Sequence, residues 1–467
     1  MDNNGRLHIV MLPWLALGHL QTFLELSKRI AQKGHRISFL STPKNIQRLP
    51  KIPQHISPLI NLVQFPLPPT ENLPAGVEVT IDLPYDDLRP YLKKAFDGLR
   101  QNVLNFLQEN SNPPVDWIIY DYAAYWIPSV SAECGVPCAY FSTFNAATLG
   151  FVGPPQVLLG KEDQRTTVHE YTVAPKWVPF PSIIAYKEYE ARQEVEPAIK
   201  QDASGVNELY RFALTIEGCD FLAIRSCIEF EPEWLELIGE LFHKDIVPVG
   251  MLPPIIQEDS NEKEWESTFR WLDQQEAGSV VYVAFGSEAK LTSAQVEQIA
   301  IGLELTQLPF LWAFRAGKAP EGFEERTKCR GFVCFDWVPQ IRILAHRSIG
   351  GFLTHGGWSS IVEGISFGLK MVVLPLMFDQ GLNARNLVER GVAAEVPRNV
   401  EDGSFTGEGI AESLRLVMVE EKGETLRAKV REYRDTFGDM EMQDKRLDDF
   451  IKYLLSHKQK KVLSTTV

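Results

Sequence analysis

The stretch from Trp337 to Gln380 constrains the fold of this chain more than any other part of the sequence. An apolar strand pattern at Ile349–Thr354 leads directly into the tight sequence His-Gly-Gly-Trp-Ser-Ser, and an amphipathic helix pattern follows from about Ser360 to Phe367. A second apolar strand pattern comes next, at Met371–Leu376. A strand, a glycine-rich turn and a helix together present backbone N–H groups and the positive end of a helix dipole to an anion. The sequence therefore predicts a cradle for a diphosphate.

Further side chains in this stretch suit a nucleotide diphosphate-sugar. Trp337 offers a flat face for a pyrimidine ring, and Gln340 offers amide hydrogen bonds. Glu363 lies one turn into the predicted helix, where a carboxylate can bind ribose hydroxyls. Asp379 and Gln380 follow a predicted strand, where they can bind sugar hydroxyls. The alternative is an ordinary βαβ unit whose glycines serve only close packing, and a lone Gly-Gly would favour it. The combination in one stretch favours nucleotide-sugar binding.

The same 44 residues resemble the signature box of the plant secondary-product glycosyltransferases, the UDP-sugar-dependent enzymes of glycosyltransferase family 1. The resemblance extends through PWLALGH near the start, IIYDY in the first half and VVYVAFGSE before the box. It implies an α/β protein of the GT-B fold, with two doubly wound Rossmann-like domains facing across a cleft. Ser359 stands where the family usually has an Asn whose amide helps to hold a phosphate, and Leu374-Pro375 replaces the usual Trp-Pro. The serine resembles a subgroup in which many members add a sugar to an existing sugar.

Alternating strand and helix patterns support two parallel sheets, each covered on both faces. In the first half we expect strands at Leu7–Leu12, His35–Leu40, Trp117–Tyr120 and Cys138–Phe141, with helices at His19–Gln32, Lys93–Leu107 and Ile127–Glu133. In the second half we expect strands at Ser279–Phe285, Pro309–Phe314, Gly331–Phe335 and Val392–Val396, with a helix at Ser293–Leu303. The Pro-rich stretches Leu67–Pro90 and Val152–Pro181 are expected to be long loops.

These patterns suggest a division into domains. Residues 1–248 are expected to form an N-terminal acceptor-binding domain, and 249–264, which are Pro-containing and then acidic, form a linker. Residues 265–440 are expected to form the C-terminal UDP-sugar-binding domain. The resemblance implies that an amphipathic helix at 441–457 crosses back to the N-terminal domain.

Two polar residues follow strands of the first half and are candidates for catalysis. His19 comes after the first strand, and Asp121 ends the strand at Trp117–Tyr120. Parallel strands bring their carboxyl ends to one rim, where an imidazole and a carboxylate can form a general base. Alone, His19 would more often be a packing histidine and Asp121 a helix cap. The resemblance resolves these alternatives, because the catalytic His and Asp of the family fall on these two positions.

The resemblance and the anion-binding pattern together define a larger candidate donor site. Besides Trp337, Gln340, Glu363, Asp379 and Gln380, its expected members are Gly18, Ser287, Val338, His355, Gly357, Trp358, Ser359 and Ser360. No Asp-x-Asp occurs and the six cysteines form no Cys-x-x-Cys pair, so we expect no metal site and metal-independent catalysis. Beyond the UDP-sugar co-substrate, no cofactor is expected. At the end of the box Gln380 resembles UDP-glucose users more than galactose users, which implies UDP-glucose as the donor, while UDP-rhamnose and UDP-xylose stay open.

Aromatic residues of the first half are candidates for the acceptor pocket. The expected members are Trp14, Tyr122, Tyr125, Phe144 and Tyr186, together with Phe378 from the end of the box. Such a lining suits a flat or polycyclic plant metabolite, phenolic or terpenoid, either free or already glycosylated. The alternative is that these aromatic side chains belong to the core.

Composition excludes other classes of protein. A net charge of −14 argues against a nucleic-acid binder, and the sequence lacks a run of 18 apolar residues that would predict a membrane span. We therefore expect a cytoplasmic protein, and nothing in the sequence suggests more than a monomer. The resemblance implies that Asp379, the one acid near the sugar, binds hydroxyls and is not a nucleophile, so we expect a single displacement that inverts the anomeric centre. Two alternatives stay open: a nucleotide-sugar-binding protein without transfer activity, and an epimerase of the same fold.

Overall fold

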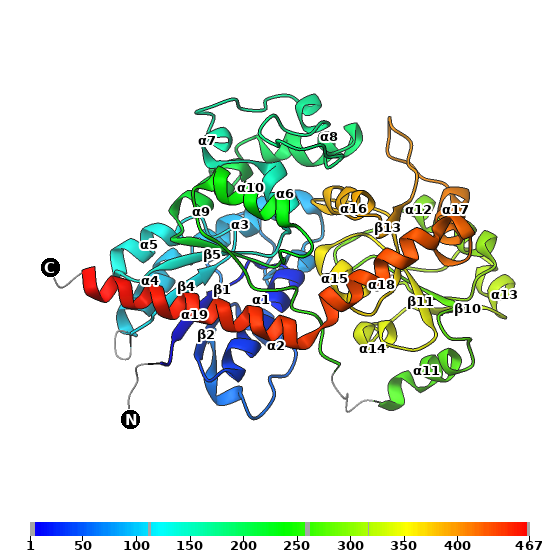
Figure 1. The fold of residues 1–467 in the computed structure, drawn as a ribbon, viewed down its shortest axis with the longest axis horizontal. Coiled ribbons are helices and arrows are strands. Elements are labelled where there is room, and N and C mark those ends of the chain that lie inside the picture. The colour runs from blue at the N-terminus through cyan, green and yellow to red at the C-terminus, as the bar shows by residue number, and fades with distance from the viewer. Residues whose placement is uncertain (1–4, 111–113, 257–261, 316, 465–467) are drawn as a thin grey trace. The chain divides into compact units, whose positions relative to one another are not determined.

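The computed structural model describes residues 5–110, 114–256, 262–315 and 317–464 (Figure 1). The chain divides into two compact units. The first comprises Met1–Thr166, Glu196–Leu252 and Glu441–Val467, and the second comprises Thr167–Val195 and Pro253–Met440. The division between Leu252 and Pro253 falls inside the linker expected at 249–264, of which residues 257–261 lie outside the described part.

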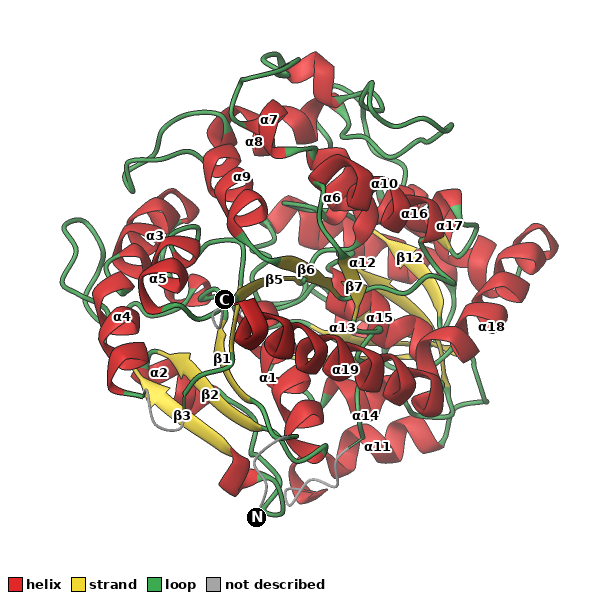
Figure 2. Ribbon diagram, turned by 60° about the vertical axis from the view of Figure 1, so that its left-hand side comes forward, coloured by secondary structure: helices red, strands yellow, loops and turns green. Residues whose placement is uncertain are grey.

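A parallel sheet forms the centre of the first unit. Among the described residues it has seven strands in the order β3-β2-β1-β4-β5-β6-β7. The strands are β1 His8–Leu12, β2 Arg36–Ser41, β3 Ile60–Gln64, β4 Trp117–Tyr120, β5 Cys138–Ser142, β6 Phe221–Ile224 and β7 Ile246–Pro248. All residues of β4, β5 and β6 are buried, as expected for strands with helices on both faces (Figure 2). The strand order reverses between β1 and β4, which makes their carboxyl ends the topological switch point of this sheet.

Helices pack on both faces of this sheet. They are α1 Leu17–Gln32, α2 Pro43–Arg48, α3 Arg89–Asp97, α4 Arg100–Glu109, α5 Ile127–Cys134, α6 Ala146–Val152, α7 Pro155–Leu158, α9 Glu208–Gly218, α10 Pro232–Phe242 and α19 Met440–Ser464. Helix α19, drawn in red in Figure 1, buries Phe450 and Leu454 in the same core cluster as β1 and α1. The indole N–H of Trp117 donates to the Leu454 carbonyl at 3.1 Å. The last helix of the chain is therefore part of the first unit.

A second parallel sheet has six strands among the described residues, in the order β10-β9-β8-β11-β12-β13. The strands are β8 Val280–Ala284, β9 Phe310–Ala313, β10 Gly331–Cys334, β11 Ile349–Thr354, β12 Lys370–Val373 and β13 Ala393–Glu395. Its helices are α11 Glu266–Asp273, α12 Ser293–Thr306, α13 Phe323–Thr327, α14 Gln340–Leu344, α15 Trp358–Ser366, α16 Gln380–Glu389, α17 Gly407–Met418 and α18 Glu424–Gly438. This order also reverses once, between β8 and β11, so the second sheet has its own switch point.

The remaining helices are short or lie at the boundary between the units. The 3-10 helices are η1 Ser57–Leu59, η2 Thr80–Asp82, η3 Asp86–Leu88, η4 Val168–Tyr171, η5 Glu262–Trp265 and η6 Glu421–Gly423. Helix α8 covers Glu188–Ala198, and the division into units falls inside it. Within the described residues, every helix is too short or too polar to span a lipid bilayer.

The structure differs from the sequence-based expectation in several places. The stretches expected to be long loops contain short helices, η2 and η3 within 67–90 and α7 and η4 within 152–181. The helix expected at Lys93–Leu107 is two helices, α3 and α4, which are separated by Gly98 and Leu99. Gly98 lies against Pro68, where a Cβ would be 2.6 Å from the proline ring. Strands β3, β6 and β7 were not expected. Strands β3 and β7 are partly exposed and carry weak patterns, whereas the buried apolar run of β6 was overlooked. Residues 167–195, expected in the N-terminal domain, group with the second unit. Ion pairs such as Glu190–Arg385 account for that grouping.

Candidate active site

Asp121 is the fixed point of the candidate site in the first unit. It follows β4, and Trp14 follows the neighbouring strand β1, with Leu12 opposite Tyr120 in the sheet. The Asp121 side chain is fully buried. Its carboxylate accepts hydrogen bonds from the backbone N–H of Trp14 at 3.0 Å and of Tyr122 at 2.8 Å. Because these two donors are on the main chain, the carboxylate is held in place by the sheet itself.

His19 lies in the first turn of α1 and faces this carboxylate. Its Nδ1 is 2.7 Å from Oδ2 of Asp121, and the Thr143 hydroxyl is 3.1 Å from the same nitrogen. The His19 side chain is 18% exposed, which leaves an edge of the ring accessible. A bond from Nδ1–H to the carboxylate favours the tautomer that carries its lone pair on Nε2. The pair is therefore arranged as a general base.

Aromatic rings surround the His19–Asp121 pair. The rings of Tyr122 and Phe144 each lie 5.8 Å from the imidazole, and both contact Phe212, which the sequence did not single out. Burial raises the pKa of Tyr122 well above its usual value, so its hydroxyl stays protonated. We call the rings of Tyr122, Phe144 and Phe212 the aromatic wall. Trp14 is only 1% exposed and packs edge-on against Phe96 and Tyr122, so its ring belongs to the core behind this wall.

The other residues expected on the acceptor side lie in different surroundings. Tyr125 is partly exposed and lies beneath the Arg211 guanidinium, at 4.9 Å from its ring centroid. Arg211 is itself fully buried and pairs with Asp97 at 2.6 Å. Gly18, which was expected in the donor site, is exposed on the first turn of α1, with open space where a Cβ would lie. Tyr186 belongs to the segment that groups with the second unit, where its backbone N–H donates to the Tyr171 carbonyl.

The candidate cradle in the second unit is formed where β8 and β11 end. Helix α15 begins at Trp358, and its N-cap, Gly357, has no side chain to bond the first N–H groups of the helix. Two glycines make room for His355: a Cβ at Gly286 or at Gly357 would lie 2.7 Å from the imidazole ring. Burial lowers the pKa of His355 to about 4. At neutral pH the ring is therefore a neutral hydrogen-bonding group rather than a fixed charge.

Hydroxyl groups lie around this helix end. Ser287 is exposed in the turn after β8, and Ser359 and Ser360 lie in the first turn of α15. The Trp358 side chain is 4% exposed and packs against Phe437 of α18. Trp358 therefore brings only its backbone N–H to the cradle, because its indole is committed to the core.

The base and ribose candidates form a connected group. Trp337 is 58% exposed, and buried Trp265 packs against its edge with ring centroids 6.2 Å apart. The Gln340 amide N–H donates to the Glu363 carboxylate at 2.7 Å, and the Tyr282 hydroxyl donates to the Gln340 amide oxygen at 3.3 Å. Val338 is buried beside Trp337. Trp265 and Tyr282 are members that the sequence did not reveal, since they lie outside the box.

The candidate sugar-binding loop connects β12 to α16. Asp379 is the N-cap residue of α16, and its carboxylate accepts a hydrogen bond from the Asn383 amide at 2.8 Å. The same amide donates to the Gly356 carbonyl at 3.0 Å, which ties the loop to the cradle. The Gln380 amide oxygen accepts from the backbone N–H of Leu376 and Met377. Phe378, expected at the acceptor, has a left-handed backbone with φ of 57° in this loop.

Comparisons with known proteins show which proteins this chain is similar to. The family model for UDP-glucoronosyl and UDP-glucosyl transferase matches residues 257–432. UDP-glycosyltransferase 91C1 of Arabidopsis thaliana is 46% identical over 452 residues, which cover 96% of this chain and 97% of that protein. Soyasaponin III rhamnosyltransferase of Glycine max is 40% identical, with 98% and 97% covered. The structure of Phytolacca americana UGT2 complexed with UDP-2fluoro-glucose and pterostilbene superposes with a TM-score of 0.75, at 25% identity, covering 96% of this chain and all of that one.

The two parallel α/β sheets and the match to solved plant glycosyltransferases confirm the predicted GT-B fold. Identity of this extent over nearly the whole chain also settles membership of the family. The chain belongs to the plant UDP-glycosyltransferases of family 1, in the subgroup of the 91-series enzymes, and is a UDP-sugar glycosyltransferase of plant metabolites.

Proposed function

We propose that this enzyme transfers glucose from UDP-glucose to a hydroxyl group of a small plant metabolite or of its glycoside, with inversion and without a metal ion. The observation that carries the proposal is the 2.7 Å contact between Nδ1 of His19 and the buried Asp121 carboxylate. A protein that only binds UDP needs no such pair. An enzyme that removes a proton from an acceptor hydroxyl does need one.

In the proposed mechanism, Nε2 of His19 accepts the proton of the acceptor hydroxyl as its oxygen attacks the anomeric carbon. Asp121 fixes the imidazole tautomer and stabilises the imidazolium that forms. UDP leaves from the opposite face of the sugar, so a single displacement turns an α-linked donor into a β-glycoside. The Asp379 carboxylate is bonded to Asn383, which supports a role in binding hydroxyls rather than as a nucleophile.

Charge on the departing UDP is proposed to be held by the N-terminal end of α15. The uncapped first turn of the helix and its serine hydroxyls supply donors there, and His355 adds a neutral one. These fixed dipoles stand in for a metal ion, and this is the basis for proposing metal-independent transfer.

The donor and acceptor are proposed from the site and from relatives. Gln380 favours UDP-glucose, and the Phytolacca americana structure was determined with UDP-2fluoro-glucose. A rhamnosyl donor is the second candidate, because a relative 40% identical to this chain is a soyasaponin III rhamnosyltransferase. The aromatic wall of Tyr122, Phe144 and Phe212 suits a phenolic or terpenoid acceptor.

A competition experiment tests the proposal. Purified protein is incubated with excess EDTA and equal UDP-glucose, UDP-rhamnose, UDP-galactose and UDP-xylose, and with a pool of phenolic and terpenoid aglycones and their monoglucosides. Mass spectrometry should detect the gain of a hexose on one class of acceptor. A gain of deoxyhexose would replace glucose by rhamnose as the donor. Protein that binds UDP but forms no glycoside from any donor would overturn the catalytic role of His19.

A further inference from the structure

The loop that carries the proposed sugar-binding residues is held by side chains from outside the signature box. Pro375, Leu376 and Met377 precede Asp379 and Gln380. These three residues belong to neither a strand nor a helix. Phe378 has a positive φ, a conformation that persists in a bulky residue only when its surroundings impose it. Side chains from two distant parts of the sequence, helix α8 and Arg398 after β13, bond the loop just before Phe378.

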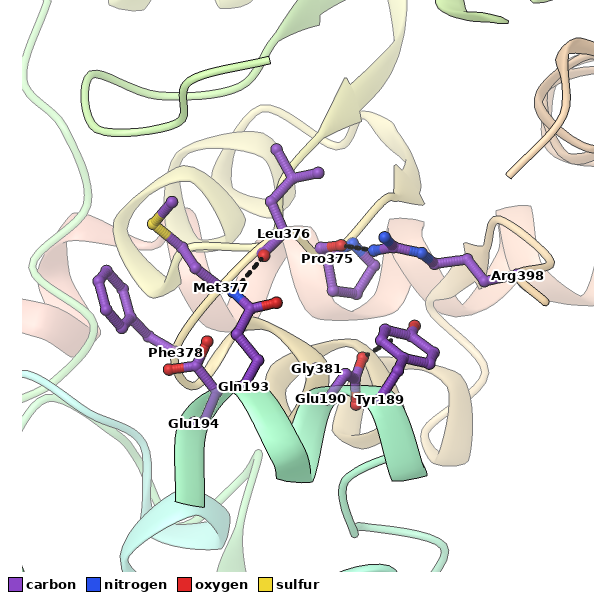
Figure 3. A pocket seen from close by; sticks show the side chains of 10 residues that line it. All are labelled: Tyr189, Glu190, Gln193, Glu194, Pro375, Leu376, Met377, Phe378, Gly381 and Arg398. Carbon is purple, nitrogen blue, oxygen red and sulfur yellow. Dashed lines mark hydrogen bonds between the residues drawn. The ribbon is translucent and has the colours of Figure 1, made fainter. Parts of the chain in front are cut away.

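Arg398 fixes the first carbonyl of the loop. Its guanidinium donates to the Pro375 carbonyl and to the Gly403 carbonyl, and it lies over the Tyr189 ring at 4.9 Å from the centroid (Figure 3). Burial lowers the pKa of Arg398, but an arginine stays charged over the physiological range. A hydrogen bond from a charged donor is stronger than one between neutral groups, so this contact strongly restrains the Pro375 carbonyl.

Gln193 of α8 holds the next carbonyl. Its amide N–H donates to the Leu376 carbonyl at 3.3 Å, as Figure 3 shows. The backbone N–H of the same Leu376 donates to the Gln380 amide oxygen at 2.9 Å. One peptide segment therefore connects Gln193 on α8 to Gln380, which is proposed to bind the sugar. A displacement of the Leu376 peptide moves the Gln380 side chain with it.

Helix α8 can serve as a support because it is itself anchored to α16. Glu190 pairs with Arg385, and both side chains are more than nine-tenths buried. Arg385 also donates to the Ala185 carbonyl at 3.0 Å and to Glu395 at 3.1 Å. A Cβ at Gly381 would lie 2.6 Å from the Glu190 carboxylate, so only glycine allows α16 to approach this pair. The support is built from buried charge pairs, which hold a defined geometry when all partners are present.

We propose that Arg398 and Gln193 are positioning residues for the donor sugar. They hold two consecutive carbonyls of the loop and thereby set the geometry of Asp379 and Gln380, while they leave the base and diphosphate positions untouched. This inference rests on the proposed function, because it assumes that the sugar of the donor contacts these two residues. Arg398 should contribute more than Gln193, since Arg398 is charged and partly buried whereas Gln193 is exposed.

The test compares binding of UDP with binding of UDP-glucose, because the two ligands differ by the sugar. Dissociation constants are measured by calorimetry without acceptor for the wild type and for Arg398→Met, Arg398→Lys and Gln193→Ala. In Arg398→Met the ratio of the UDP-glucose constant to the UDP constant should rise about tenfold, with the UDP constant nearly unchanged. Arg398→Lys should lie between this variant and the wild type, and Gln193→Ala should raise the ratio about twofold to threefold.

Arg192→Met is the matched control. Arg192 lies next to Gln193 on α8, but among the described residues its guanidinium pairs only with Glu188 at the surface, so the ratio should stay at the wild-type value. An equal loss of UDP and UDP-glucose binding in Arg398→Met, or an unchanged ratio, would overturn the inference. If Arg398→Met does not fold, Arg398→Lys and Gln193→Ala decide by the same criterion. Wild-type protein that forms no glycoside would instead overturn the proposed function, which separates the two failures.

Discussion

The proposed catalytic pair of the first unit and the proposed donor site of the second are built in different ways, although each lies at the switch point of its own sheet. In the first unit, two side chains 102 positions apart in sequence meet because β1 and β4 are neighbours. In the second unit, one continuous stretch supplies the helix end, the base platform and the sugar loop. Proton transfer needs one short and accurate contact, whereas an extended ligand needs a long surface whose parts keep their spacing. The His19–Asp121 pair should therefore control turnover, and the donor site of the second unit should control affinity for the donor.

The largest effect is expected from His19→Ala. Removal of the general base should lower kcat by about 10³-fold, since general-base catalysis typically contributes about 10²–10⁴-fold. The dissociation constant of UDP should stay within about twofold, because His19 is proposed to contact the acceptor hydroxyl and is not among the residues proposed to bind UDP. Steady-state kinetics and calorimetry measure the two quantities. A parallel loss of turnover and UDP binding would contradict the separation of roles.

Asp121→Asn should have the second largest effect. An asparagine retains the shape but cannot accept from Trp14, Tyr122 and His19 together, so the histidine tautomer is no longer fixed. We expect kcat to fall roughly 100-fold while the dissociation constant of UDP stays at the wild-type value.

Asp116→Asn is its matched control, because Asp116 is also buried and accepts the backbone N–H of His8 at the opposite end of β1. Asp116→Asn should lower the melting temperature without a selective loss of kcat. An equal loss of kcat in both variants would mean that Asp121 acts only through the stability of the sheet.

Trp337→Ala should show the opposite pattern to His19→Ala. Loss of the exposed indole face removes the proposed stacking of the base, which contributes about 1–3 kcal/mol, so the UDP constant should rise about tenfold. The kcat at saturating donor should change less than about twofold, since uniform binding does not alter the chemical step. The UDP dissociation constant of Trp337→Phe, which keeps a smaller ring, should lie between those of the wild type and Trp337→Ala. A large fall in kcat would show that donor affinity and turnover are not controlled by separate groups of residues.

The smallest effect concerns pH and His355. Its pKa in the folded chain, about 4, lies below the usual 6.5, so between these values the unfolded chain binds a proton that the folded chain does not. The contribution to stability is therefore complete above pH 6.5 and decreases as the pH falls toward 4. Denaturant titrations should show this slope in the wild type and a shallower one in His355→Gln. The UDP-glucose constant should change less than about twofold between pH 6.5 and 8, because His355 stays neutral there.

Much of the fold was predictable because strong patterns mark buried parallel strands and the helices between them. The strand at Trp117–Tyr120 matches its prediction residue for residue, since four apolar residues in a row leave little freedom. Strand β3 was missed because its side chains are half exposed, and α3 and α4 were merged because the close approach of Pro68 to Gly98 cannot be read from local sequence.

The residues of the site were predictable where they lie in a recognisable motif. The proposed roles of His19, Asp121 and the box followed from sequence and family resemblance, and they stay proposals. Asn383, Tyr282 and Trp265 were missed because what marks each of them is a contact to another site residue, which only the structure shows. Trp14 and Trp358 were expected at the ligands, yet both rings are buried in their own unit. An aromatic residue beside a motif looks the same in sequence whether it faces the pocket or supports it.

Residues 167–195 group with the second unit although residues of the first unit flank them in sequence, and this has a consequence for protein engineering. A chimaera that exchanges the donor-binding half of two relatives by a single cut near Leu252 would take α16 from one parent and Glu190 from the other. The buried Arg385 would then depend on a foreign segment for its partner, and the sugar loop would lose its native support. A module for donor exchange should therefore consist of 167–195 and 253–440 together, with the final helix left to the acceptor half. The residues to be exchanged together are therefore discontinuous in sequence, although they form one compact unit.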